Sequence, residues 1–204
     1  MRIRQHVNPL RSDYLQIPLT SLDLPRDRPI EVELGSAEAF FLMERAAEDP
    51  ERSYIGVEIR RELVAQSNDE CERKSLGQVR SVFANISVDL PRLFPPRSVN
   101  RFFINFPDPW FKHRQRKRRV VGEDLVDQLF DLLEPDGEVH VATDIFDIAL
   151  DAMTALEWEA PRRFANLHEP WSFLRKSHFA ARSFRERLCE REGVRIWRLA
   201  YRRL

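Results

Sequence analysis

The spacing of apolar residues switches along the chain between the alternation of a strand and the spacing of a helix. The first third shows this succession twice. Residues 29–35 alternate and end in glycine, which predicts a short strand followed by a tight turn. Residues 37–50 carry apolar side chains at helical spacing and stop at a proline, which predicts a helix. The same succession returns as a strand over 53–59 and a helix over 60–77. This order is typical of an α/β protein.

The remaining chain continues the alternation with some less regular stretches. We expect further strands in the segments 79–90, where a loop follows the strand, 99–106, 138–144 and 193–204. We expect helices over 122–137, with acids in the first turn and Pro-Asp-Gly at the stop, and over 145–157. Residues 158–192 show no clear period. The arm 1–28 is rich in proline and charge and is expected to hold little regular structure.

Strands that alternate with helices imply a mostly parallel sheet with helices on both faces. A single domain over residues 1–204, including the arm 1–28, is an ordinary size for such a fold, and no repeat or linker divides it. Ligands of these sheets bind outside the carboxyl ends of the strands. The chemistry is therefore expected where the strands end.

The composition limits which cellular compartment and which binding partners we expect. The chain has 33 basic and 33 acidic residues, so any attraction to nucleic acid must come from local clustering rather than total charge. Its two cysteines lack CxxC spacing and His companions at zinc-ligand intervals, so neither a metal site nor a disulfide framework is expected. There is no signal peptide and no run of about 18 apolar residues, so we expect no membrane partner and a cytoplasmic protein.

Two acidic strand ends indicate an adenosine-containing ligand. Glu33 and Gly35 lie at the first strand-to-helix turn, where a nucleotide can approach main-chain amides, although Gly35 could also simply close the turn. Glu58 ends the second strand about 20 residues later, where an acid can hold ribose hydroxyls. A solvated acid paired with Arg60 or Arg61 is the alternative for Glu58.

The turn is poor in glycine, because Ala37 and Ala39 stand where a pyrophosphate-binding loop would need further glycines. This disfavours an NAD-dependent dehydrogenase. S-adenosylmethionine carries no phosphate, and its cationic groups favour a nearby carboxylate such as Glu33. After the third strand, Asn85 could read an adenine edge, although asparagine is equally common in turns.

The segment FPDPWFKHRQRKRR, residues 106–119, combines a stiff acid with a basic run. Pro107 and Pro109 restrict the backbone on either side of Asp108, which suits a group that must keep its geometry during catalysis. Six basic residues follow within eight positions and could hold nucleic-acid phosphates near the cofactor. Asp144 ends the fifth strand at the same edge, where capping of the next helix is its other possible role.

The motif FPDPW-x-K-x-R-x-x-KRR, preceded by E-x-G and followed by ATD, resembles the bacterial tRNA (guanine-N7)-methyltransferases. The strings RQHVNPL and ANISV are similar to the cyanobacterial and plastid branch of that family, and the likeness covers nearly the whole chain. It implies a class I, Rossmann-like S-adenosylmethionine-dependent fold with a mostly parallel seven-stranded sheet. It also implies transfer of a methyl group to N7 of a variable-loop guanosine in tRNA.

The resemblance carries over residue by residue. It implies a catalytic role for Asp108 and a cofactor site made of Glu33, Gly35, Glu58, Asn85 and Asp108. The residues expected to bind tRNA are Lys112, Arg114, Asp144, Ser183 and Glu186, the last two standing for a Thr-x-x-Glu element of the family. No metal is implied, and monomer and homodimer both remain open.

The chain departs from the family's E-x-G-x-G-x-G loop at Ala37 and Ala39. If those positions require a positive φ, each methyl group costs on the order of 1 kcal/mol. The Thr-x-x-Glu element departs as well, since it encloses Phe184 and Arg185 in place of Lys-Phe. A catalytically weak or inactive tRNA-binding protein derived from the same fold is therefore the alternative function.

Overall fold

The computed structural model describes residues 27–110, 120–160 and 162–204. Within them, the strands are β1 (Ile30–Leu34), β2 (Ser53–Glu58), β3 (Val79–Phe83), β4 (Val99–Asn105), β5 (Leu133–Thr143), β6 (Phe164–Asn166) and β7 (Trp197–Arg203). The helices are α1 (Phe40–Glu48), α2 (Arg61–Arg73), α3 (Ile86–Leu93), α4 (Glu123–Leu132), α5 (Phe146–Met153), the π-helix η4 (Thr154–Glu159) and α6 (Phe184–Glu192). The expectations for Lys112, Arg114 and most of the arm 1–28 fall outside the described residues.

The strands form one seven-stranded sheet in the order β3-β2-β1-β4-β5-β7-β6. Strands β1 to β5 run parallel, whereas β7 is antiparallel to both β5 and β6. The order reverses at β1, where the chain leaves for β2 on one side and later returns to β4 on the other. Such a reversal opens a crevice at the carboxyl ends of the strands. The expected α/β fold with a mostly parallel seven-stranded sheet is confirmed.

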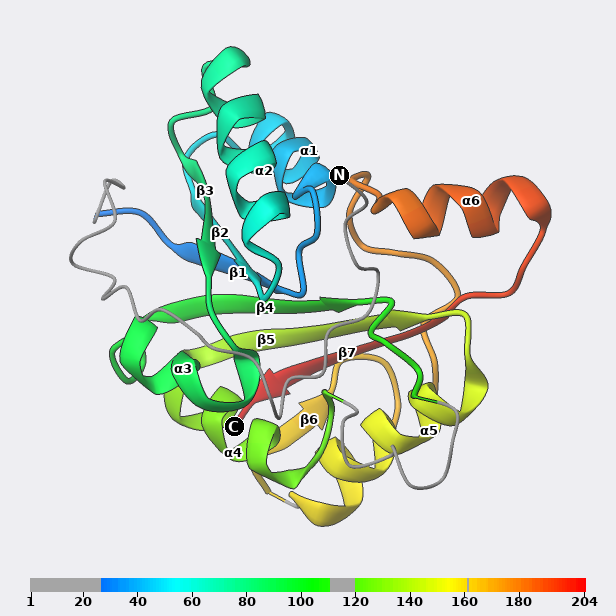
Figure 1. Ribbon diagram of the computed structural model, residues 1–204. Helices are drawn as coiled ribbons and strands as arrows, with labels where there is room; N and C mark the ends of the chain where they lie inside the picture. Colours follow the sequence, from blue (N-terminus) through cyan, green and yellow to red (C-terminus); the bar gives the residue numbers. More distant parts are fainter. Residues whose placement is uncertain (1–26, 111–119, 161) are drawn as a thin grey trace.

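Helices cover both faces of this sheet (Figure 1). Alternate side chains of the central strands point to opposite faces, as in Ile55 and Tyr54 of β2, and so contribute to two separate buried clusters. The larger cluster packs the sheet against α3, α4 and α5. The smaller one packs the other face against α1 and α2. Among the described residues, no helix is both long enough and apolar enough to span a membrane.

Two local expectations were wrong. The loop expected after the third strand is helix α3, because Asn85 accepts a hydrogen bond from the Ser87 N–H (3.0 Å) and so caps a helix start. Helix α4 ends at Leu132, not at Gly137. The Pro-Asp-Gly segment belongs to β5 at a register irregularity, where Asp136 has a φ of 60° and a Cβ on Gly137 would lie 2.9 Å from the Glu134 carbonyl oxygen. Residues 158–192, which show no clear period, hold β6 and α6.

Candidate active site

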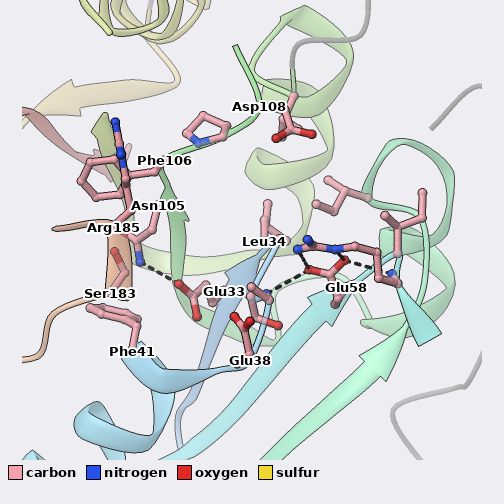
Figure 2. A pocket seen from close by; sticks show the side chains of 18 of the residues that line it. Glu33, Leu34, Glu38, Phe41, Glu58, Asn105, Phe106, Asp108, Ser183 and Arg185 are labelled. Atoms are coloured by element: carbon pink, nitrogen blue, oxygen red, sulfur yellow. Dashed lines mark hydrogen bonds and ion pairs between the residues drawn. The ribbon is translucent and has the colours of Figure 1, made fainter. Parts of the chain in front are cut away.

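A cavity of about 290 Å³ opens at the carboxyl ends of β1, β2, β3 and β4 (Figure 2). The loops after these four strands form its walls, and the start of α6 closes the remaining side. Six of the expected site residues line it: Glu33, Gly35, Glu58, Asn85, Asp108 and Ser183. The sheet therefore brings together residues that are up to 150 positions apart in the sequence (183 − 33).

Glu33 is a buried carboxyl group with one unsatisfied oxygen. Its side chain is 3% exposed, and Asn105 Nδ2 donates to Oε1 at 2.9 Å, whereas Oε2 has no hydrogen-bond partner among the described residues. Burial raises the pKa of Glu33 from 4.5 to about 8, the Asn105 bond opposes that rise, and the charge of Glu58 adds to it. An oxygen of this kind fits a donated N–H from a ligand, above all from a cation.

The turn between β1 and α1 is built from left-handed backbone conformations. The Gly35 N–H donates to the Val57 carbonyl (2.8 Å), and φ is 81° at Gly35, 47° at Ala37 and 56° at Ala39. Only glycine adopts such angles without strain, so the two alanines are held at a cost of about 1–2 kcal/mol each. The two positions where the E-x-G-x-G-x-G pattern has glycine thus adopt a positive φ in this chain, which meets the condition stated for strain there.

Gly56 in β2 also shapes this turn, and sequence reasoning did not find it. A Cβ at Gly56 would lie 2.4 Å from the Ser36 Oγ, so only glycine lets the β1–α1 turn lie so close to β2. The Ser36 side chain is buried, lines the cavity, and its hydroxyl has no partner among the described residues. The cavity therefore offers at least two buried polar atoms, Glu33 Oε2 and Ser36 Oγ, to a bound group.

Glu58 lines the cavity, as the ribose-binding role requires, and it also pairs with Arg60. Its carboxylate accepts from Arg60 Nε (2.8 Å), Arg60 Nη2 (2.9 Å), the Arg60 main-chain N–H (2.9 Å) and the Ala37 N–H (2.9 Å). It is 2% exposed, so it is not a solvated acid. The neighbouring Arg61 instead lies over the Phe83 ring, 4.1 Å from its centroid.

The loop after β4 carries Asp108 into the cavity wall. Phe106 has a φ of 49°, and its N–H donates to the Ala142 carbonyl at 2.7 Å, which ties the loop to the end of β5. Pro107, Asp108 and Trp110 then line the same cavity as Gly35. The described part of the motif thus faces the predicted cofactor site, and in Figure 2 Asp108 lies across the cavity from Glu33.

The remaining residues expected to bind substrate differ in whether they reach the cavity. Ser183 lines the cavity and caps α6 through the Glu186 N–H (3.2 Å). Glu186 is buried and bound to Arg198 (2.6 Å), and it is not among the residues that line this cavity. Asp144 forms an ion pair with Arg185, and it is Arg185 that reaches the cavity.

The chemistry of the lining suits an adenosine ligand with a cationic end. At the end of β1, Glu33 Oε2 supplies an acceptor, and Glu58 places a carboxylate at the end of β2. Asn85 stands at the end of β3, where its side chain also holds the start of α3. Apolar side chains from Leu34, Phe106 and Trp110 supply surfaces for rings. Within the described parts of the chain, no group of three or more His, Cys, Asp or Glu residues could hold a metal ion.

Solved structures define the class of the fold. It is similar to that of the aminoglycoside resistance methyltransferase NpmB1 (TM-score 0.57, 14% identity, 93% of this chain and 95% of that one). It is also similar to that of TrmN from Thermus thermophilus (TM-score 0.57, 19% identity, 91% of this chain and 47% of that one). At such identities the likeness concerns the fold alone. The fold is that of a class I S-adenosylmethionine-dependent methyltransferase.

Sequence comparison gives the family. Residues 27–199 match the methyltransferase family Methyltransf_4. The tRNA (guanine-N(7)-)-methyltransferase of Thermosynechococcus vestitus is 33% identical over 100% of this chain and 95% of its own length. The protein of that name from Microcystis aeruginosa is 35% identical over 99% and 98%. One from Synechococcus sp. (strain JA-3-3Ab) is 40% identical over 72% and 64%.

The chain therefore belongs to this methyltransferase family, and the resemblance seen in its motifs is confirmed. By this family it is a methyltransferase, and S-adenosylmethionine is the cofactor that the family and its class I fold imply. The unsatisfied Glu33 Oε2 and Ser36 Oγ can accept from that cofactor's amino group, so the residues present suit the group the family implies.

Proposed function

We propose that this protein transfers a methyl group from S-adenosylmethionine to N7 of a variable-loop guanosine in tRNA. One observation carries the proposal: the Pro107-Asp108 loop, which begins the family's basic motif, forms one wall of the cavity that Glu33 and Gly35 form on the other side. The relatives from Thermosynechococcus vestitus and Microcystis aeruginosa are named tRNA (guanine-N(7)-)-methyltransferases, which supports the choice of base and RNA. The protein would act in the cytoplasm on tRNA, as a monomer or homodimer.

Each residue has a role that its position permits. Glu33, Gly35, Glu58 and Asn85 would hold the cofactor, which supplies an electrophilic methyl group when bound. Guanine N7 has an in-plane lone pair and no proton, so no strong general base is required. Asp108 would orient the base through its N1 and N2 hydrogens and stabilise the positive charge that develops on it. Lys112, Arg114, Asp144, Ser183 and Glu186 remain proposed tRNA contacts.

Mass spectrometry of nucleosides tests this function. Unmodified tRNA incubated with the protein and S-adenosylmethionine should gain 7-methylguanosine. Asp108→Ala should lower the rate by about a hundredfold or more, because an electrostatic contact to the reacting base is lost. Its affinity for tRNA should stay within about twofold, since phosphate contacts dominate affinity. Asp69→Ala, which removes an exposed acid from α2, is the matched control. Full activity of Asp108→Ala would remove Asp108 from the site.

The strained turn supports a second candidate, a tRNA-binding protein with weak or no catalysis. Ala37 and Ala39 adopt positive φ angles in the loop that must approach the cofactor. Isothermal titration calorimetry with S-adenosylmethionine separates the two candidates. Binding together with methyl transfer supports the enzyme, whereas tRNA binding without detectable cofactor binding supports the alternative.

A further inference from the structure

Every acceptor position of Glu58 is already used by the protein. A carboxylate offers about four lone-pair sites, two on each oxygen. Oε1 accepts from the Arg60 main-chain N–H and Arg60 Nε, and Oε2 accepts from Arg60 Nη2 and the Ala37 N–H. All four donor–acceptor distances are 2.8–2.9 Å, and the residue is 2% exposed. A ribose hydroxyl can therefore donate to this carboxylate only where one of the present donors leaves.

Two of the four donors cannot leave without rebuilding the backbone. The Ala37 N–H belongs to the turn that leads into α1, and the Arg60 N–H belongs to the residue that caps α2. The other two belong to the Arg60 guanidinium, whose long side chain can rotate as a unit. The guanidinium therefore occupies the acceptor sites that a ribose diol would use.

We propose that Arg60 is a built-in competitor of the cofactor: its guanidinium occupies the ribose-binding side of Glu58, and an adenosine ligand binds by displacing it. The inference rests on the cofactor site of the proposed function and adds a residue that limits cofactor affinity. It also explains why a ribose-binding acid is followed so closely by an arginine in the sequence.

Two acidic side chains of the cavity could pair with the displaced Arg60 guanidinium. Glu38 and Asp108 line the same cavity, and both lie near enough that their charges raise the pKa of Arg60, after the larger effect of its bond to Glu58. The Arg60 side chain is 20% exposed, so it already reaches the surface of the cavity. Cofactor binding would thus move a positive charge from the ribose site toward Asp108, the residue proposed to meet the guanine.

Calorimetry on the full chain with S-adenosylhomocysteine tests this competition. Arg60→Met keeps the apolar stem and removes both competing donors, so affinity should rise about tenfold, because no charged hydrogen bond to Glu58 has to be broken before the ribose binds. Arg60→Lys keeps the charge but cannot form the two-pronged pair, so a smaller rise is expected. Arg61→Met is the matched control, because Arg61 lies over Phe83 instead, and it should change affinity less than twofold.

A 2′,3′-dideoxy analogue of S-adenosylhomocysteine isolates the ribose hydroxyls, and its affinity should be the same for wild type and Arg60→Met. An equal gain for the analogue would overturn the inference, because general charge removal would then explain it. Unchanged or weaker binding of S-adenosylhomocysteine by both Arg60 variants would also overturn it and make Arg60 a support of Glu58. Wild-type binding would leave the proposed function intact in those cases, whereas no binding by any variant would overturn both.

Discussion

The buried carboxyl group of Glu33 is expected to make both stability and cofactor binding depend on pH. Its raised pKa means that the folded protein holds a proton between about pH 4.5 and pH 8 that the unfolded chain releases. The contribution of this group to stability is therefore fully present below about 4.5 and is lost as pH rises through about 8. A bound ammonium group reverses the preference, because it favours the carboxylate.

Glu33→Gln should remove this pH dependence. We expect the free energy of unfolding of wild type to fall, relative to that of the variant, as pH rises from 6 to 9, measured by urea denaturation at each pH. Wild type should also release up to about one proton on binding S-adenosylhomocysteine at pH 7, seen by calorimetry in buffers of different ionisation enthalpy. Parallel pH profiles for the two proteins would show that Glu33 does not titrate in this range.

The turn between β1 and α1 is the element in which the chain differs most clearly from its family's pattern. Its two alanines have nearly the same φ but different surroundings, since Ala37 is partly exposed and Ala39 is fully buried. Replacing either by glycine relieves strain of about 1–2 kcal/mol in the folded protein. It also stabilises the unfolded state by about 0.4–1 kcal/mol, because glycine gives the unfolded chain more conformational entropy. At Ala39 the lost burial of a methyl group costs about a further 0.8 kcal/mol.

Ala37→Gly should therefore stabilise the protein by about 0.5–1 kcal/mol in urea unfolding, and Ala39→Gly should be close to neutral. Ala65→Gly serves as the control, because Ala65 is exposed in the middle of α2 and glycine there should cost about 0.5–1 kcal/mol. If all three changes destabilise equally, the left-handed conformation at Ala37 is not a source of strain. Tighter binding of S-adenosylhomocysteine by Ala37→Gly would show that the strain also limits the cofactor site.

At the scale of the whole molecule, charge pairing limits where RNA can be attracted. The formal net charge is zero, and three arginines that could extend a basic track along α6 are matched by acids. Arg182 pairs with Glu190, Arg185 with Asp144, and Arg187 with Glu44. Exposed pairs of this kind contribute little field at a distance. The basic run 112–119, known from the sequence, is therefore expected to provide most of the phosphate attraction.

Reversal of Lys117 and Arg118 to glutamate should weaken tRNA binding and flatten its dependence on salt. Each lost phosphate contact should lower the slope of log K against log salt concentration by about 0.7–0.9. Filter binding or fluorescence anisotropy between about 50 and 200 mM salt measures the slope. Arg73 and Lys74, at the C-terminal end of α2, do not line the cavity. Their reversal makes the same change in net charge and should leave the slope nearly unaltered. Equal slopes for both double variants would contradict the role of the run.

Sequence patterns predicted helices and strands best where a regular apolar spacing continued over many neighbouring residues. The order of strands and helices through β3, the strand β4 and the turn at Gly35 follow from apolar spacing and from residues with restricted backbones. The helix α3 was missed because its start depends on Asn85 and its eight residues are too few to show a clear period. Helix α6 was missed because it is mostly polar and buries little more than Glu186 and Cys189.

The chain itself determined which chemical groups arrive at the strand ends, because alternation and turn residues are local properties: Glu33, Glu58, Asn85 and Asp108 were recognisable for that reason. Only the tertiary structure decided which hydrogen-bond or ion-pair partner each of these groups has. Glu33 meets Asn105 because β1 lies beside β4, and Glu186 in the first turn of α6 meets Arg198 of β7, 12 residues further along the chain. Such pairs depend on strand order and on the desolvation that packing imposes, and neither is encoded in the spacing of neighbouring residues.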